Sequence, residues 1–356
     1  MLNRGTDETA TPTVTPLRLA AVVVIMVLTV LASEWAGGRF LDRNGTNLGY
    51  VYIAHKWKVL GDLDEPIDWL VVGDSSGSQG FDPAVAEQLT GKRSINLATI
   101  GNFGLQDDLW MLEEYIERFG PPEKMVLIHV YDVWHRRFRP KLVGRIPRRW
   151  VTTEETAERY DFDEEQRKEI LLNRYVRLFA ERKSLRKTIE FTWLKLTKDE
   201  EELEEIRRKD RKLPNEDPEL TDSGFVRVCG ALPKSVKRDA RGHVRTLAKR
   251  RSRISKDNKE ALLAIAELAR EHDFTVHIVP GPVYERLRLK KEFQKYFDTE
   301  VRQLRKIVKD HPQVYVSDEI RGFNGDQLQN VDHLACEHTE TFTRWAVDQI
   351  QSADTK

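Results

Sequence analysis

The chain has 356 residues, enough for one large domain or two small ones with a substantial buried core. Charged residues make up 33% of it, but 58 basic and 58 acidic side chains balance to zero, so the overall charge indicates no polyanionic partner. The two cysteines, Cys229 and Cys336, are too few for a disulfide-rich scaffold or a four-cysteine zinc site. Either they form one bridge in a domain outside the cytoplasm, or they are two unpaired thiols.

The N-terminal region contains a long apolar run. Residues 1–16 are rich in threonine, proline and charge, and we expect them to be disordered. Leu19 to Ala32 is apolar except for one threonine, which is short for a spanning helix and fits the core of a cleaved signal peptide. Residues 17–40 can also span as an anchor, with Trp35 and Arg39 at the interface. Both alternatives predict a membrane-directed segment.

The next part of the sequence indicates an α/β domain. Residues 41–67 predict a connecting segment with a short helix. A βαβαβ pattern follows, in which the third strand is almost continuously apolar, as expected for a strand buried on both faces. Asp82 is a candidate N-cap before a proline at the first helical position. The expected strands are Trp69–Val72, Ser94–Ala98 and Met125–Tyr131, and the expected helices are Pro83–Leu89 and Gln106–Phe119.

Residues 136–256 differ in composition, because apolar strand runs vanish and charge rises. We expect one or two long charged helices over Asp163–Lys212 and a loop over Leu213–Pro233. Seven basic residues lie between 136 and 149 with no acid among them. They fit an anionic lipid surface or an acidic polysaccharide, or solvated faces paired with acidic helices. We interpret this region as a charged helical insertion that serves as a cap or partner surface.

The sheet pattern resumes after the insertion and completes the domain. We expect the α/β domain to comprise residues 68–135 and 257–352, with a helix at the C-terminus. The remaining expected elements are helices at Asn258–His272 and Phe293–Val308 and strands at Phe274–Val279 and Val314–Val316.

A serine and a histidine carry the candidate chemistry. Ser75 follows the first strand in Gly73-Asp74-Ser75, and this segment would turn at the later glycines and expose the serine at the carboxyl edge of a parallel sheet, where α/β proteins bind ligands. A serine hydroxyl needs a base, and His333 has a side chain suited to proton transfer near neutral pH. Alternatively, Ser75 only makes turn hydrogen bonds and His333 only caps the helix that follows.

At these residues the chain resembles the SGNH/GDSL hydrolase superfamily, which has a Gly-Asp-Ser segment after the first strand and an Asp-x-x-His segment near the end. It is similar to the membrane-anchored branch that acts on cell-surface polymers, such as the alginate and peptidoglycan O-acetylation proteins and the lipoteichoic acid D-alanylation protein. The resemblance covers residues 68–135 and 257–350 and the N-terminal segment. It implies a three-layer flavodoxin-like SGNH fold with a parallel sheet, one transmembrane helix at residues 17–40 and an exported domain.

The resemblance also implies further site residues. The backbone N–H of Ser75 and of Gly101 and the side chain of Asn102 would form the oxyanion hole. Asp132, at the carboxyl end of the third strand, would line the pocket. The third block lacks the asparagine donor of soluble relatives.

The main departure from the family pattern is Asn330, which stands where the family has the triad aspartate. Asparagine orients an imidazole but does not stabilise the imidazolium by charge. Asp332 is an alternative third member, although adjacent side chains rarely reach each other's ring nitrogens. Any esterase activity is therefore expected to be weak.

The resemblance implies acyl-ester hydrolysis or O-acyl transfer on a cell-surface glycan, with Ser75, His333 and Asn330 as the catalytic set. A membrane-bound O-acyltransferase would be the partner, and no cofactor, metal or nucleic acid is implied. The alternative is a weak or inactive SGNH-like binding protein that recruits the glycan or the acyltransferase. Asn330 and His338 favour that alternative.

Overall fold

The structure is a computed structural model. It describes residues 15–45, 48–147, 149–150, 153–209, 218–249 and 252–354. Most of the N-terminal segment for which we expect disorder, residues 1–14, lies outside the described residues.

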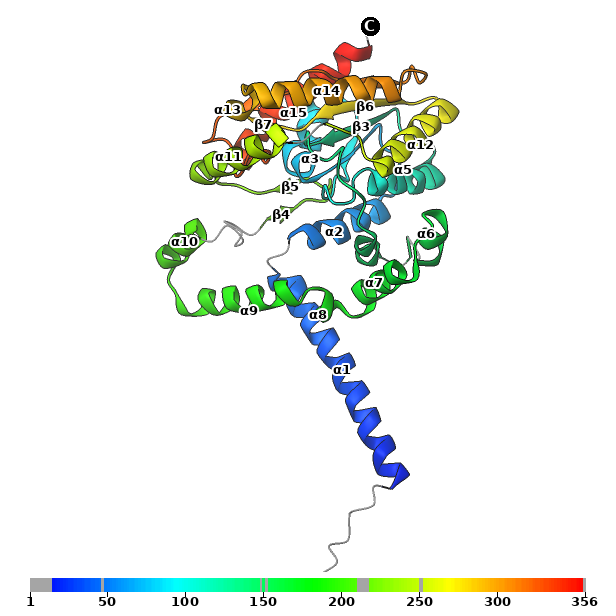
Figure 1. Ribbon diagram of the computed structural model, residues 1–356, viewed down its shortest axis with the longest axis vertical. Coiled ribbons are helices and arrows are strands. Elements are labelled where there is room, and N and C mark those ends of the chain that lie inside the picture. Colours follow the sequence, from blue (N-terminus) through cyan, green and yellow to red (C-terminus); the bar gives the residue numbers. More distant parts are fainter. Residues whose placement is uncertain are drawn as a thin grey trace, which may run out of the picture.

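A parallel five-stranded sheet forms the centre of the molecule, in the order β2-β1-β3-β6-β8 (Figure 1). Every neighbouring pair in it is parallel. The expected α/β class with a parallel sheet is thus confirmed. The order reverses next to β1, and such a switch point opens a crevice at the carboxyl ends of the strands. The strands are β1 (Trp69–Gly73), β2 (Ser94–Asn96), β3 (Lys124–His129), β6 (Thr275–Pro280) and β8 (Val314–Val316).

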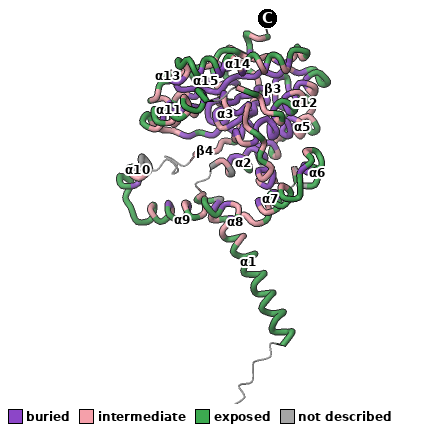
Figure 2. Tube along the Cα trace, viewed as in Figure 1, coloured by how far each residue is buried: buried purple, intermediate pink, exposed green. Residues whose placement is uncertain are grey.

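Helices cover both faces of this sheet. Leu70 and Val72 of β1 join one buried cluster, whereas Trp69 and Val71 join the other, as the alternation of a strand requires. Figure 2 shows the buried residues gathered between these layers. The first cluster is covered by α2 (Leu48–Asp62), α5 (Gln106–Phe119) and α12 (Lys256–His272). The second is covered by α4 (Pro83–Thr90), α11 (Pro233–Lys249), α13 (Glu285–Arg288), α14 (Lys291–Ile307) and α15 (Thr339–Asp354), and α14 also reaches the first.

Several expected elements are confirmed. The helix expected at Gln106–Phe119 is α5, with the same bounds. Asp82 caps α4 by accepting the N–H of Ala84, and Pro83 opens that helix. The strand expected at Val314–Val316 is β8.

The helix expected within residues 41–67 is α2, but it has 15 residues and belongs to the core rather than being a short helix in a connector. Ile53, Trp57 and Leu60 of α2 are fully buried in the first cluster. Lys56 of the same helix is also buried, and it donates to the carbonyl of Asn96 at 2.9 Å and to that of Gly224. These bonds fix α2 to β2 and to the insertion.

The insertion is more broken than expected. It contains a 3₁₀ helix, several shorter helices, and an antiparallel hairpin. The expectations of one or two long helices over Asp163–Lys212 and of a loop throughout Leu213–Pro233 were therefore wrong. Asp161, with φ of 49°, and the non-helical Val176 interrupt the helical run. Residues 210–217 lie outside the described residues. The described elements of residues 136–256 are η1 (Pro140–Arg145), α6 (Thr153–Arg159), α7 (Glu164–Tyr175), α8 (Arg177–Ala180), α9 (Arg182–Thr197), α10 (Glu200–Lys209), β4 (Glu219–Leu220), β5 (Val226–Arg227) and α11, which packs on the second cluster.

Helix α1 (Pro16–Asn44) extends away from the rest of the protein (Figure 1). Its part from Pro16 to Leu41 is long and apolar enough to cross a membrane, and it is the one such helix in the described part of the chain. The large apolar side chains of α1 between Leu17 and Trp35 are exposed, whereas Leu41 near its end is buried (Figure 2).

Candidate functional site

The segment that carries Ser75 begins where β1 ends. Gly73 has φ of 142°, and a Cβ there would lie 1.9 Å from the carbonyl oxygen of Ile128, so this position requires glycine. Asp74 caps α3 (Ser75–Gly80), a short helix that contains Gly77 and Gly80. The turn expected at these glycines was therefore wrong.

Asp74 organises this segment. Its Oδ1 accepts the backbone N–H of Ser76 at 2.8 Å and the Ser76 hydroxyl at 2.6 Å, and its Oδ2 accepts the N–H of Val130 at 2.9 Å. Burial opposes the charge of Asp74, but His129 and these donors outweigh it and hold the pKa of this carboxyl below its usual range. Ser76, rather than Ser75, is thus the serine that binds the capping side chain of α3. Among the described residues, no side-chain hydrogen bond engages the Ser75 hydroxyl.

A buried histidine lies behind Asp74. His129 at the end of β3 has its Nε2 2.7 Å from Asp108 Oδ2 and its Nδ1 3.7 Å from Asp74 Oδ2. Burial would lower the pKa of His129, but Asp108 and Asp74 outweigh burial and raise it to about 9. The sequence reasoning did not assign His129 a role. Its only signal was a single histidine in an apolar strand.

The loop that carries His333 holds the imidazole from one side. His333 Nδ1 lies 2.6 Å from Asp332 Oδ1 and 2.8 Å from Asn330 Oδ1. Asn330 Oδ1 also accepts the backbone N–H groups of Asp332 and His333, at 3.0 and 2.9 Å. Asp332 therefore reaches the ring although it is the neighbouring residue, and the alternative that the sequence left open has the required geometry. The Asn330 side chain folds the loop into an Asx turn, and this turn brings the next-but-one carboxylate beside the imidazole.

The charge of Asp332 decides the protonation of His333. Burial favours the neutral ring, but Asp332 outweighs it, and the pKa of His333 is raised above the ordinary 6.5. Because Nδ1 faces two oxygens, Nε2 is the ring nitrogen left for a reacting group. The residues described show no hydrogen bond at that nitrogen, and none joins His333 to Ser75.

Contacts place the His333 loop and α3 at the same edge of the sheet. A Cβ at Gly281, just after β6, would lie 2.3 Å from the hydroxyl of Ser76. Tyr284, three residues further on, donates its N–H to the carbonyl of Val331 at 2.7 Å. The charge of Asp74 also acts on His333.

The expected oxyanion residues follow β2. Thr99 donates its N–H to the carbonyl of Gly73 at 2.8 Å, so the chain continues beside β1 toward Gly101 and Asn102. Gly101 is buried and Asn102 is half-buried. A Cβ at Gly101 would lie 2.6 Å from a guanidinium nitrogen of Arg136, so the glycine makes room for that arginine.

Asp132 and Arg136 form an ion pair at this edge, with 2.5 Å between Oδ1 and the guanidinium nitrogen. The charges of Asp74 and Asp332 raise the pKa of Arg136. The charge of Arg136 in turn acts to lower the pKa of His333, against the larger effect of Asp332. The sequence predicts Asp132 at the pocket, but it indicates Arg136 only as one of the seven basic residues between 136 and 149. The structure therefore adds one cation to the candidate site.

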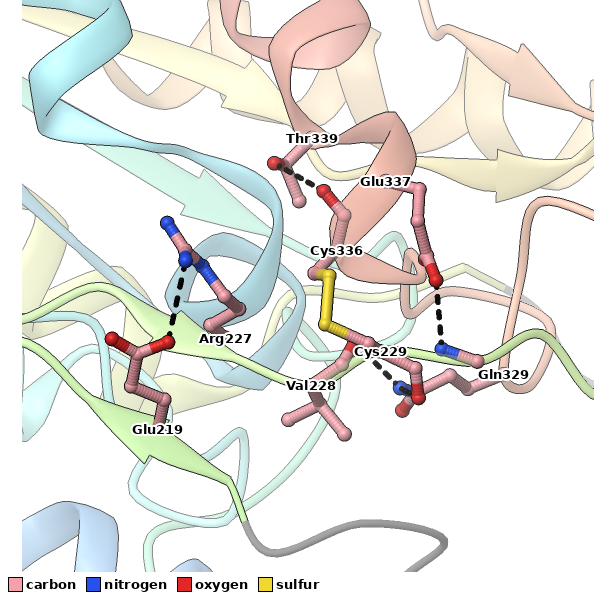
Figure 3. Close-up of a disulfide and its surroundings, with 9 residues drawn as sticks. Glu219, Arg227, Val228, Cys229, Gln329, Cys336, Glu337 and Thr339 are labelled. Atoms are coloured by element: carbon pink, nitrogen blue, oxygen red, sulfur yellow. Dashed lines mark hydrogen bonds and ion pairs between the residues drawn. A yellow bond between two sulfur atoms is a disulfide. The ribbon is translucent and has the colours of Figure 1, made fainter.

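Cys229 and Cys336 form a disulfide, so of the two alternatives left open by the sequence, one bridge or two unpaired thiols, the structure has the bridge (Figure 3). It connects the segment after β5 to η2 (Cys336–His338), just beyond the His333 loop. Cys336 donates its N–H to the carbonyl of Val228 at 2.9 Å. Glu337 lies near both sulfurs, but bridged cysteines are not thiolates and so do not offer the usual metal ligands.

No protein-family model matches the sequence, and no curated protein is significantly similar to it. A functional assignment of this site therefore depends on its geometry and on the motif resemblance.

Proposed function

We propose that the protein is a membrane-anchored, extracytoplasmic, SGNH-like acyl-ester hydrolase or O-acyltransferase that acts on a cell-surface glycan. The observation that carries the proposal is the position of the His333 ring. Two oxygens, from Asp332 and Asn330, hold Nδ1 and leave Nε2 for a nucleophile at the sheet edge where Ser75 lies.

The chemistry would be acyl transfer in two steps. The Ser75 hydroxyl attacks the acyl carbonyl while His333 Nε2 takes its proton, and the imidazolium then protonates the departing alcohol. An acyl-serine ester remains. Water or a sugar hydroxyl attacks this ester, again with His333 as the base, and frees Ser75. The N–H groups of Ser75 and Gly101 and the Asn102 side chain would stabilise the oxyanion in both steps.

Two features support an exported domain. Helix α1 provides a membrane segment ahead of the domain. The Cys229–Cys336 disulfide is typical of proteins in an oxidising compartment and is rare in the cytoplasm. The glycan, an acetyl group as the acyl unit and a membrane-bound O-acyltransferase as the donor follow from the motif resemblance alone.

The test is covalent labelling of the purified full-length chain with a fluorophosphonate, which reacts with activated serines. We expect one adduct on Ser75 by mass spectrometry, and its loss in Ser75→Ala and His333→Ala. Ser78→Ala, in the same short helix, is the matched control and should label normally. Hydrolysis of p-nitrophenyl acetate should follow the same pattern. Equal reactivity of the wild-type chain and Ser75→Ala would refute the proposed catalysis.

A non-catalytic binding protein is the second candidate. It is favoured by the lack of a hydrogen bond between Ser75 and His333 among the described residues, and by the missing asparagine in the third block. An unlabelled Ser75 in a folded protein would support this candidate, in which the same edge binds an acylated glycan without cleaving it.

A further inference from the structure

The exposed apolar side chains are not scattered over the molecule. Beyond α1, nearly all the exposed large hydrophobic residues in the described chain lie on the consecutive helices α7, α8 and α9, and only Leu89 and Leu289 lie elsewhere. Those on the three helices are Leu171, Tyr175, Phe179, Ile189, Trp193 and Leu196. We call them the apolar belt. Such a cluster on one side of a protein marks an interaction surface.

Helix α8 of the belt contacts α1 at one level along its axis, between Glu34 and Gly38. Leu178 of α8 donates its N–H to the Glu34 carboxylate at 3.1 Å, and a Cβ at Gly37 would lie 2.5 Å from the Leu178 side chain. Arg177 donates to the carbonyl of Gly38 at 3.3 Å. Glu181, which is buried, binds Arg177 and thereby fixes α8 further.

That height coincides with the end of the apolar run. The 20 residues from Leu17 to Ala36 form about 30 Å of helix, which matches the hydrocarbon thickness of a bilayer. Trp35 is exposed at the end of this stretch with Arg39 over its ring, as is common at a membrane interface. If α1 spans the membrane, α8 therefore lies at the level of the headgroups.

Helix α9 continues from α8 across the end of α1, rather than along it (Figure 1). Ile189, Trp193 and Leu196 have the spacing of one helical face and are 54%, 66% and 77% exposed. Arg182 and Arg186 precede them in the same stripe. Helix α9 has five basic residues and a single acid, Glu190.

We propose that the apolar belt is a membrane-binding surface, in which α9 lies in the interface with its exposed stripe among the acyl chains and headgroups of anionic phospholipids. Apolar and aromatic side chains flanked by arginine and lysine are the composition that such interfacial helices use. The adjacent anionic headgroups complement the charge of α9. This proposal requires α1 to span the membrane, but it is independent of any reaction at Ser75.

The experiment uses the full-length chain in vesicles of phosphatidylcholine and phosphatidylglycerol, without reductant, so that the disulfide persists. Trp193→Cys carries an environment-sensitive thiol dye, and doxyl-labelled lipids are the quencher. Leu289→Cys is the matched control, since Leu289 is 57% exposed and lies outside the belt. Val27→Cys, inside α1, reports insertion of the anchor.

We expect the Trp193 dye to be quenched several-fold more than the Leu289 dye, and Arg186→Glu to reduce that difference. Labelling at Ile189→Cys should repeat the result from the same stripe. If the Val27 dye is quenched but the Trp193 and Ile189 dyes behave like the Leu289 dye, the proposal is overturned and the belt faces another protein. An unquenched Val27 dye overturns it as well, since the belt then has no membrane beside it.

Discussion

Asn330 and Asp332 both face His333 Nδ1, but their chemistry differs. Asn330 shapes the loop, because one oxygen accepts two backbone N–H groups as well as facing the ring. In the proposed reaction, Asp332 would supply the charge that favours the imidazolium formed during attack by the serine. Asp332, rather than Asn330, is therefore the residue that would act as the third member of a triad.

We predict that Asp332→Asn lowers kcat strongly, toward the roughly four orders of magnitude seen for the same change in a serine protease. Asn330→Asp should raise it little, since a carboxylate is already present at Nδ1. The measurement is ester hydrolysis by the full-length chain, with circular dichroism as a control for folding. A large gain in Asn330→Asp with no loss in Asp332→Asn would reverse the two assignments.

The pH profile of the same reaction gives a second prediction. His333 acts as a base only when neutral, and its pKa is raised above 6.5. The rate should therefore rise with pH through a midpoint above that value. Removing the charge in Asp332→Asn should move the midpoint to lower pH. An unchanged midpoint in this variant would mean that another group titrates.

The Asp74–His129–Asp108 cluster predicts how stability depends on pH. The pKa of His129 is about 9 in the folded protein and about 6.5 in the unfolded chain, where its contacts are lost. Its contribution to the free energy of unfolding is therefore fully present below pH 6.5 and is lost as the pH rises through about 9. The contribution is on the order of 3 kcal/mol. Thermal unfolding from pH 6 to 10 should show this loss in the wild-type chain and a much smaller one in His129→Asn. Asp318→Asn, an exposed site, should match the wild type.

At the level of single residues, the sequence indicates where in the fold a candidate site residue lies better than it indicates which side chains that residue contacts. Ser75 and His333 were selected because strand ends and turn residues are visible in a sequence. The contacts of Asp332, His129 and Arg136 were not, since they depend on a loop folded by Asn330 and on side chains meeting across strands. The contact of His129 with Asp108 joins two different elements of the fold, and that of Asp332 with His333 joins adjacent side chains, which rarely point toward each other.

At the scale of elements, the sheet and the helices that pack on it followed from apolar periodicity, as α5 and β8 show. The sequence did not predict the core position of α2 or the hairpin β4–β5, and these were missed for different physical reasons. Helix α2 lies before the first strand, where the sequence alone does not show that its apolar residues belong to the core of the sheet domain. The hairpin β4–β5 has only two residues in each strand, too few for an alternation to be seen. Its place is set by contacts with β2, through Lys56 and Gly224, rather than by its own sequence.

The disulfide gives a prediction for the His333 loop. It closes a separation of 107 residues, for which the chain-entropy argument gives roughly 4–5 kcal/mol of stability. Cys229→Ser with Cys336→Ser should lower the unfolding temperature, and it should reduce ester hydrolysis below the unfolding range because the bridge adjoins η2 and the loop. Treatment of the wild-type chain with a reductant should have the same effects. Identical unfolding and activity with and without reductant would contradict this role.

At the scale of the whole molecule, α1 and the apolar belt define one side and the sheet domain the other (Figure 1). The insertion connects them: η1 and α7 pack together beneath the domain, and α8 contacts α1. If α1 spans the membrane and α9 lies in the interface, as we propose, these two attachments restrict the tilt of the domain more than a single tether would. The candidate site would then lie at a fixed distance from the membrane surface.

The last prediction concerns the anchor itself. We expect the full-length chain to remain in the membrane fraction after alkaline carbonate, to be extracted by detergent, and to have its domain degraded by protease added from outside the membrane. The reason is that the stretch from Leu17 to Ala36 has two charged residues, Arg18 and Glu34, each near one of its ends, and no charge between them, so transfer of its apolar part into hydrocarbon is favourable. Leu28→Arg places a charge at its centre at a cost of about 2.5–3.5 kcal/mol and should shift part of the protein out of the membrane fraction. A soluble exported protein whose N-terminus lies near Ser33 would show instead that the segment is a cleaved signal peptide, and the membrane-binding role of α9 would then lose its basis.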